Sequence, residues 1–167
     1  MRLRATDLDD PVARGLVLRQ WTELCERYEA PAPCGEDSAL PTGSFREPEG
    51  AFLVGEVDGA AVACGGVRRC QDGQAGVGEI KRMYVEPHRR GTGLGRVLLA
   101  ALEEEGRRLG YLRLWLETGT AQPEALHLYE ASGWTPIPKY GEYKHDADSR
   151  CYEKVLRART GAERAVR

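Results

Sequence analysis

The sequence has no excess of charge of either sign. Its 24 lysine and arginine residues and 26 aspartate and glutamate residues leave a formal net charge of −2 at pH 7. Domains that bind nucleic acid are typically strongly basic, so this balance argues against a nucleic-acid partner. Any site for an anion must therefore be built from a local group of residues.

Long apolar runs are also missing. No stretch approaches the roughly 18 consecutive apolar residues of a transmembrane helix. Asp7, Asp9 and Asp10 stand where a signal peptide would carry its apolar core. We therefore expect no membrane partner and a cytoplasmic location.

Cysteine pairs of the C-x-x-C type, which mark many zinc and redox sites, are absent. The five cysteines are odd in number and widely spaced: Cys25, Cys34, Cys64, Cys70 and Cys151. Free thiols in a reducing compartment are the expected state. The histidines are scattered as well, so we expect neither a metal nor a cysteine nucleophile.

The composition is that of a globular protein, with 41% hydrophobic and 30% charged residues among 167. The length fits one domain. We expect this domain to span residues 1–156 and a basic, aperiodic tail to follow over residues 157–167, with a frayed terminus as the default interpretation.

Periodicity and turn residues predict an alternation of strands and helices. Strands are expected at 2–6, 52–57, 60–68, 79–85, 111–118, 134 and 151–156, and helices at 11–28, 94–109 and 124–132. Asp10-Pro11 should cap the first helix, and Asp58-Gly59 should close a hairpin. This order predicts an α/β fold with a mixed sheet and helices on both faces.

The strand over residues 79–85 is polar on both sides. Simple alternation places Glu79, Lys81, Met83 and Val85 on one face and Ile80, Arg82 and Tyr84 on the other. Because neither set is apolar, we expect one face to line a cleft.

A glycine turn follows that strand and leads into a helix. Gly91, Gly93 and Gly95 allow close approach of a ligand to the backbone, and the helix N-terminus attracts anions. Positive side chains flank the turn, namely His88, Arg89, Arg90 and Arg96. A phosphate or pyrophosphate is the expected guest, and the alternative is a glycine-rich helix start without a ligand.

Two familiar phosphate-binding loops do not match this turn. It has neither the spacing nor the lysine of a P-loop, and Arg96 or Leu98 stands where the dinucleotide fingerprint needs its third glycine. Glu117 lies about 20 residues further on, where a ribose-binding acid could sit, so dinucleotide binding stays as a minor alternative.

Two motifs resemble those of the GNAT superfamily of N-acetyltransferases. Arg90-Gly-Thr-Gly-Leu-Gly95 matches the pattern [QR]-x-x-G-x-[GA] and is similar to the coenzyme A pyrophosphate loop of that family. The block from Gln122 to Trp134 resembles its later motif ending in L-Y-x-x-x-G-[FW], with Gln122 where many members carry asparagine. The resemblance covers residues 50–135.

The resemblance implies a single GNAT-like domain with a mixed, mostly antiparallel sheet of six to seven strands. It also implies acetyl-CoA as cosubstrate, with the pantetheine arm along the strand backbone and the pyrophosphate over the turn. The implied cofactor-binding residues are Met83, Tyr84, Val85, Arg90, Gly91, Thr92, Gly93, Leu94, Gly95, Arg96 and Gln122.

Catalytic roles follow from the same resemblance. Glu79 matches a glutamate that deprotonates the attacking amine, and a salt bridge to Arg82 or Lys81, or plain solvation, is the equally weighted alternative. Tyr129 matches a tyrosine that protonates the leaving thiolate, whereas without the motif a core tyrosine would be expected.

The expected acceptor is a primary amine of a small molecule or amino acid, which attacks directly in a ternary complex. The alternatives are a protein lysine or N-terminus as the acceptor, and a non-catalytic acyl-CoA-binding module. A homodimer is left open. Four acids against one arginine in the irregular stretch 30–50 weakly favour a cationic acceptor, and residues 140–150 are a second candidate for substrate contact.

Overall fold

The structure is a computed structural model that describes residues 1–29, 42–73 and 75–156. The predicted tail over 157–167 and residues 30–41 of the irregular stretch lie outside these ranges. Within them, no helix combines the length and the apolar character needed to cross a bilayer.

Three α-helices and seven strands are found in the described ranges. The helices are α1 (Pro11–Arg27), α2 (Leu94–Arg108) and α3 (Pro123–Ala131), and the strands are β1 (Arg2–Thr6), β2 (Ala51–Val57), β3 (Ala60–Arg69), β4 (Val77–Val85), β5 (Arg113–Gly119), β6 (Thr135–Ile137) and β7 (Ser149–Val155). The strands form one sheet in the order β1-β2-β3-β4-β5-β7-β6. Only the β4–β5 pair is parallel, so the prediction of a mixed, mostly antiparallel sheet is confirmed.

Local sequence signals account for the element boundaries. The Asp10 side chain accepts hydrogen bonds from the backbone N–H groups of Val12 (2.8 Å) and Ala13 (3.2 Å), which caps α1. Asp58 and Gly59 have φ values of 53° and 79°, as a type I′ turn between β2 and β3 requires. Both predictions are confirmed.

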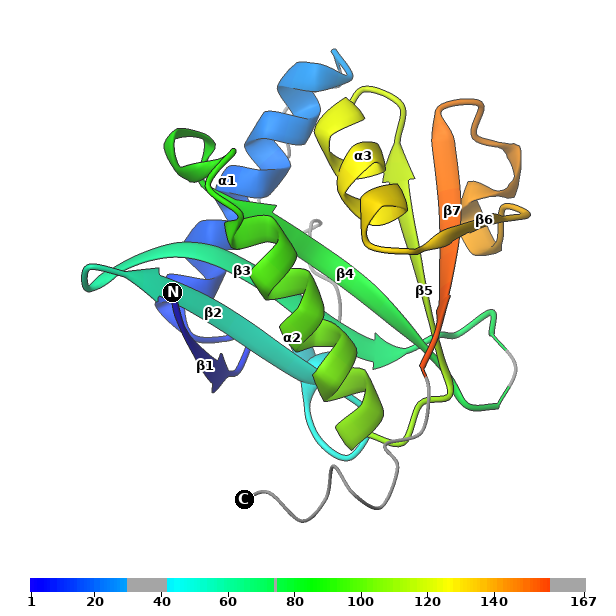
Figure 1. The fold of residues 1–167 in the computed structure, drawn as a ribbon, viewed down its shortest axis with the longest axis horizontal. Helices are drawn as coiled ribbons and strands as arrows, with labels where there is room; N and C mark the ends of the chain where they lie inside the picture. Colours follow the sequence, from blue (N-terminus) through cyan, green and yellow to red (C-terminus); the bar gives the residue numbers. More distant parts are fainter. Residues whose placement is uncertain (30–41, 74, 157–167) are drawn as a thin grey trace.

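Helices cover both faces of the sheet (Figure 1). α2 and α3 bury Leu98, Leu102 and Tyr129 in one core, with Leu53 of β2. α1 buries Leu16 in a second core, which contains the next β2 residue, Val54. Because successive strand residues point to opposite faces, one strand serves both cores.

The sheet opens between β4 and β5. The two strands pair from Val77 with Arg113 up to Ile80 with Leu116, and no pairing follows beyond that point. Figure 1 shows them diverging toward the end of the sheet where α1 and α3 lie. This divergence creates the cleft that holds the candidate site.

A β-bulge in β4 overturns the simple alternation expected from the sequence. Lys81 pairs with Gly66 and Tyr84 with Cys64, so two residues of β4 oppose the single residue between them on β3. Arg82, within the bulge, has a φ of 59°. Met83 and Val85 therefore pack on the same core as Ile80, and Tyr84 packs in the other core. The prediction that Met83 and Val85 share a face with Glu79, and Tyr84 with Ile80, is wrong.

Candidate active site between the diverging strands

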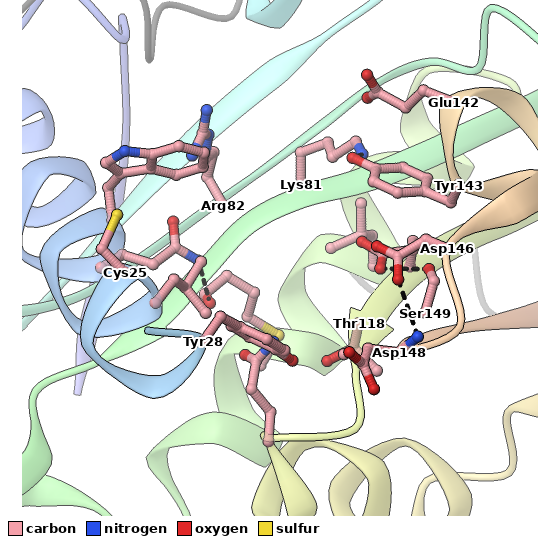
Figure 2. Close-up of a pocket in the computed structure, with 18 of the residues that line it drawn as sticks. Cys25, Tyr28, Lys81, Arg82, Thr118, Glu142, Tyr143, Asp146, Asp148 and Ser149 are labelled. Carbon is pink, nitrogen blue, oxygen red and sulfur yellow. Dashed lines mark hydrogen bonds between the residues drawn. The ribbon is translucent and has the colours of Figure 1, made fainter. Parts of the chain in front are cut away.

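Two cavities meet where β4 and β5 separate. We call the first, of about 560 Å³, the glycine-loop cavity, since it is lined by Gly91, Gly93 and neighbouring residues of β4 and α3. We call the second, of about 470 Å³, the polar cavity, and Glu117 is among its walls. Figure 2 labels further lining residues, among them Lys81, Glu142, Tyr143, Asp146, Asp148 and Ser149. They share five lining residues: Gln20, Leu24, Met83, Gln122 and Tyr129.

The glycine turn has the backbone geometry of an anion site. Gly91 and Gly93 have φ values of 75° and 85°, and a Cβ on either would meet no atom within 4 Å. Gly93 is the N-cap of α2, so the first-turn N–H groups and the positive end of the helix dipole are available to a ligand. Gly95 instead allows close packing on Leu128, at 3.3 Å from its Cβ position.

Most of the expected cofactor-binding residues line the glycine-loop cavity: Met83, Tyr84, Val85, Arg90, Gly91, Gly93, Gly95, Arg96 and Gln122. Thr92 and Leu94 are not among its walls. The Thr92 hydroxyl donates to the carbonyl of Arg89 at 2.7 Å, and Leu94 packs against the core under α2.

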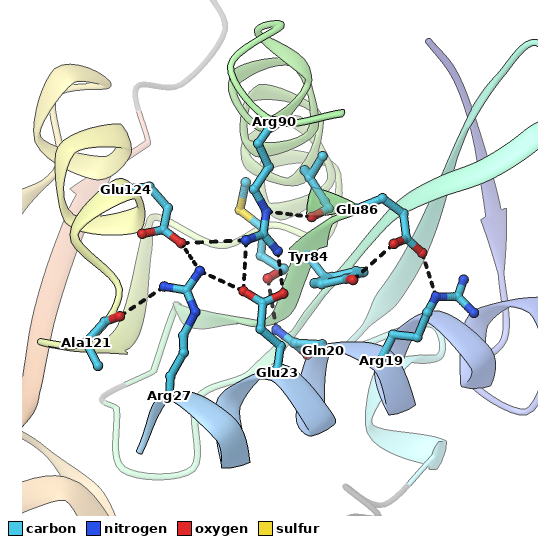
Figure 3. A network of polar contacts seen from close by, with 11 residues as sticks. Arg19, Gln20, Glu23, Arg27, Tyr84, Glu86, Arg90, Ala121 and Glu124 are labelled. Atoms are coloured by element: carbon cyan, nitrogen blue, oxygen red, sulfur yellow. Dashed lines mark hydrogen bonds and ion pairs between the residues drawn. The ribbon is translucent and has the colours of Figure 1, made fainter. Parts of the chain in front are cut away.

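Arg90 is held in an ion network that joins α1 to α3 (Figure 3). Its guanidinium donates to both oxygens of Glu23, at 2.8 and 2.6 Å, and to the carbonyl of Val85 at 2.9 Å. These hydrogen bonds hold the pKa of Glu23 below its usual value. Glu23 therefore offsets much of the positive charge that Arg90 brings to the turn. Arg96, which is exposed, lines the same cavity.

Tyr129 lies at the junction of the two cavities. Its side chain is buried at 7% exposure, and its hydroxyl is 3.9 Å from the Met83 sulfur. Burial raises the pKa of Tyr129 above its ordinary value, so the hydroxyl stays protonated at neutral pH. A protonated phenol at this junction is a hydrogen-bond donor that faces both cavities.

Glu79 lines neither cavity. It is 3% exposed, and one of its oxygens accepts from Arg68 Nε and Nη2 at 3.1 and 2.9 Å. The other oxygen accepts from the Tyr140 hydroxyl at 2.9 Å and lies 3.2 Å from Lys81 Nζ. The structure thus places Glu79 in a buried ion network, as in the salt-bridge alternative, although Arg68 takes the place expected for Arg82.

Glu117, near the end of β5, is one of the carboxylates that line the polar cavity. Its side chain accepts a 2.5 Å hydrogen bond from the Ser149 hydroxyl. Burial raises the pKa of Glu117 above its usual value, and the Ser149 hydrogen bond and the Lys81 charge oppose that effect only in part. A half-buried carboxylate with a raised pKa in a cavity suits proton transfer near neutral pH.

The remaining walls of the polar cavity come from the segment after β6. Glu142, Tyr143, Asp146, Asp148 and Ser149 line it, which agrees with residues 140–150 as a candidate for substrate contact. From the sequence, Glu117 was expected only as a ribose-binding acid, yet it lines the polar cavity and not the glycine-loop cavity. One sequence signal could have identified Glu117 as a cavity residue. It lies near the end of a strand and falls outside the alternating apolar positions, Leu114 and Leu116.

Comparison with known proteins agrees with this geometry. The profile of the Acetyltransferase (GNAT) family matches residues 16–134. An IAA acetyltransferase from Azospirillum brasilense is 36% identical over 82% of this chain and 89% of its own length.

Solved structures give the same result. A protein from Klebsiella pneumoniae assigned as an acyl-CoA N-acyltransferase superposes with a TM-score of 0.72, at 30% identity, over 93% of this chain and 97% of its own. An aminoglycoside 6′-N-acetyltransferase in complex with coenzyme A, at 18% identity, shares the fold with a TM-score of 0.69 over 96% of this chain and 99% of its own. These matches replace the dinucleotide-binding alternative, and the chain belongs to the GNAT family of acetyltransferases.

Proposed function

We propose that the protein transfers the acetyl group of acetyl-CoA to a primary amine of a small molecule, by direct attack in a ternary complex. The observation that carries this proposal is the pair of cavities that share Met83 and Tyr129 at the opening between β4 and β5. One cavity suits the cosubstrate and the other suits an acceptor. The acyl-CoA N-acyltransferase assignment of the Klebsiella protein supports transfer to nitrogen.

The glycine-loop cavity fits the cosubstrate. Positive-φ glycines and the start of α2 offer N–H groups to a pyrophosphate, and Arg96 adds a charge at the rim. Beyond Ile80, no strand among the described residues pairs with β4 on its β5 side. An extended pantetheine arm bears amide groups, so it can align along this edge as an added strand would.

Glu117 is the proposed general base. Acetyl-CoA supplies a thioester whose carbonyl carbon accepts the amine, and only the neutral amine attacks. An alkyl ammonium group has a pKa of about 10.4, so it must lose a proton near neutral pH. In the polar cavity, Glu117 accepts this proton directly or through one water.

Tyr129 and the β4 backbone complete the proposed machinery. A backbone N–H of β4, that of Val85, would stabilise the charge that develops on the carbonyl oxygen. The Tyr129 hydroxyl, kept protonated by burial, donates to the departing sulfur. The C–N bond forms as the C–S bond breaks, and the second proton that the nitrogen loses replaces the one that Tyr129 gives to the sulfur. The products are an N-acetylated amine and the free thiol of coenzyme A.

The test is acyl transfer by the purified protein and its Tyr129→Phe variant. With saturating acetyl-CoA and a panel of primary amines, thiol release should be amine-dependent in the wild type. Tyr129→Phe should lower kcat by about 10- to 100-fold while the acetyl-CoA Kd changes little, because a hydrogen bond made at the departing sulfur contributes only in the transition state.

A matched tyrosine provides the control. Tyr152 is also buried and packs 6.0 Å from the Tyr129 ring, but it lines neither cavity and its hydroxyl donates to Glu130. Tyr152→Phe should keep kcat. Acetyl-CoA binding without transfer to any amine would favour the non-catalytic module, and equal kcat in Tyr129→Phe would remove the acid role.

A second prediction tests the glycine turn. Gly93→Ala should weaken acetyl-CoA binding by tenfold or more, because the new methyl group would enter the space above the turn. Gly59→Ala is the matched control, since Gly59 also has a positive φ of 79° and open space around a Cβ. Both variants should lose about 1 to 2 kcal/mol of stability from backbone strain. Only Gly93→Ala should raise the Kd measured by calorimetry, and equal Kd values in the two variants would show that the turn does not hold the cosubstrate.

A further inference from the structure

The polar cavity is acidic at its exposed rim and apolar along α1. Three exposed carboxylates, which we call the rim carboxylates, belong to Glu142, Asp146 and Asp148 (Figure 2). Leu24 and Cys25 of α1 line the same cavity, and Figure 2 shows Cys25 on the side away from the rim carboxylates. A ligand that fills the cavity therefore meets apolar side chains on one side and negative charge on the other.

The rim carboxylates form no ion pair within the ranges that the structure describes. The basic side chains nearby in the chain contact backbone carbonyls instead. Lys139 donates to the carbonyl of Asp146, and Arg150 donates to the carbonyls of Ala147 and Ser149, at 3.0 and 2.8 Å. The negative charge at the rim is therefore available to a cationic ligand.

The rim carboxylates lie beside the proposed base. Ser149, whose hydroxyl donates to Glu117 at 2.5 Å, directly follows Asp148 in the chain. Asp146 accepts a hydrogen bond from the backbone N–H of Asp148 at 2.8 Å, and its charge is one of the causes that raise the pKa of Glu117. Glu117 is half-buried, so one wall of the cavity carries carboxylates from the interior to the solvent.

Two cationic side chains also line the cavity, and both already have neighbours. Lys81 Nζ lies 3.2 Å from Glu79 and donates to the Tyr143 hydroxyl at 2.8 Å. The Arg82 guanidinium lies over the Trp21 ring on the α1 side, 5.0 Å from its centroid (Figure 2). Because Glu79 balances Lys81 and Arg82 lies on the other side, the rim keeps its negative charge.

Gln20 adds an unsatisfied acceptor at the inner end of the cavity. Its Nε2 donates to the Met83 carbonyl at 2.9 Å, whereas its Oε1 is buried and has no hydrogen-bond partner among the residues described. Buried acceptors normally have a donor, and Gln20 lines both cavities. An N–H group of a ligand at the junction of the cavities would supply that donor.

We propose that the acceptor is an alkyl diamine; this inference rests on the proposed function and specifies its substrate. The reacting amine lies between Gln20 Oε1 and Glu117, the alkyl chain passes along Leu24, and the second ammonium group binds the rim carboxylates. The reacting nitrogen passes one proton to Glu117, gains the acetyl group, and loses a second proton that restores the Tyr129 hydroxyl. The sulfur leaves as the thiol of coenzyme A, and the second ammonium group keeps its charge throughout.

The test compares acceptors that differ only at the end remote from the reacting amine. Putrescine with butylamine and cadaverine with pentylamine form two such pairs, assayed at saturating acetyl-CoA. We expect the kcat/KM of each diamine to exceed that of its monoamine by at least tenfold, well above the factor of two that its two equivalent amines supply. γ-Aminobutyrate, which places a carboxylate at the remote end, should be the poorest substrate. Added salt should raise the KM of putrescine more than that of butylamine, because screening weakens contacts between exposed charges.

The double variant Glu142→Gln, Asp146→Asn removes two rim charges. The new amide of residue 146 can still accept the hydrogen bond from the N–H of Asp148, so the segment should keep its conformation. The preference for diamines should fall toward the statistical factor of two, through a higher diamine KM. Glu26→Gln, Glu49→Gln is the control, because it changes the net charge equally at two exposed carboxylates that line neither cavity. It should retain the wild-type preference.

Two results would overturn the proposal. One is equal kcat/KM values for diamine and monoamine in the wild-type protein, which does not depend on how any variant folds. The other is an unchanged diamine preference in the folded Glu142→Gln, Asp146→Asn protein.

A binding measurement separates this inference from the proposed function. Putrescine and butylamine are titrated by calorimetry into the protein saturated with coenzyme A, where no acetyl group is present. Binding of putrescine that depends on the rim carboxylates, without acetyl transfer from acetyl-CoA, would support the diamine site and refute the proposed function. Acetyl transfer to both amines without any preference for the diamine would refute the inference and support the proposed function.

Discussion

Glu117→Gln should lower kcat by about 10²- to 10⁴-fold, the usual contribution of general acid–base catalysis. The glutamine can still accept the hydrogen bond that the Ser149 hydroxyl gives to Glu117, so the cavity keeps its shape. What disappears is the group that removes the proton from the amine. Steady-state thiol release with the best amine of the panel measures the effect.

The pH profile gives an independent readout of the same residue. Burial raises the pKa of Glu117, so the carboxyl becomes an ionised base only as pH rises through that raised value. In the wild type, kcat should therefore show an acidic limb that falls below this pKa. That limb should vanish in Glu117→Gln, because glutamine does not titrate.

The contribution of Glu117 to stability should depend on pH in the opposite direction to kcat. A carboxyl whose pKa is higher in the folded state than in the unfolded state binds more protons when folded, so its contribution to stability declines as pH rises. Glu117→Gln removes that unfavourable ionisation, and the Tm at neutral pH should not fall.

Glu103→Gln is the control for kcat. Glu103 is a buried carboxylate on α2 that contacts Trp134 and lines neither cavity, so this variant should keep kcat. A wild-type kcat in Glu117→Gln would assign the base elsewhere.

Features set by neighbouring residues could be predicted from the sequence. The Asp10 cap, the Asp58-Gly59 turn and the glycine turn at the start of α2 each depend on residues within one or two turns of chain. Their conformations follow from side-chain capping and from the freedom of glycine at positive φ. The resemblance to a family then supplied the expectation of a mixed, mostly antiparallel sheet, which local signals do not determine.

Features set by distant contacts could not be predicted. The bulge at Arg82 depends on how β4 pairs with β3, and strict alternation therefore failed at that residue. Arg90 lies beside the glycine turn, yet its guanidinium is held by Glu23, which is 67 residues away in the chain. Glu117 and the segment 142–149 come together because β5 pairs with β7, a contact that no local pattern shows.

Glu79→Gln should destabilise the protein by about 3 to 5 kcal/mol, because removing one partner leaves the others buried without their counter-charge. Arg68 is only 8% exposed, and both of its contacts to Glu79 are charge-assisted. For a chain of this length, each kcal/mol corresponds to about 2 to 4 °C in Tm. Thermal and urea unfolding measure the loss.

A surface pair provides the comparison. Glu49 lies 3.1 Å from Arg69, and both side chains are more than half exposed, at 59% and 65%. Glu49→Gln should cost less than about 1 kcal/mol, because water and salt screen exposed charges. The contrast isolates burial as the cause of the larger effect at Glu79.

The same variant also decides between the two roles that the sequence left open for Glu79. If Glu79 belongs only to a structural ion network, Glu79→Gln should keep kcat per folded molecule within about tenfold of the wild type. Removal of a general base would instead lower kcat by at least about 10²-fold. Arg68→Met combined with Glu79→Met should be less destabilising than the sum of the two single changes, because no unpaired charge then remains between them. An unchanged Tm together with a collapse of kcat would instead make Glu79 the base, and the contacts to Arg68 and Tyr140 would then have to open during turnover.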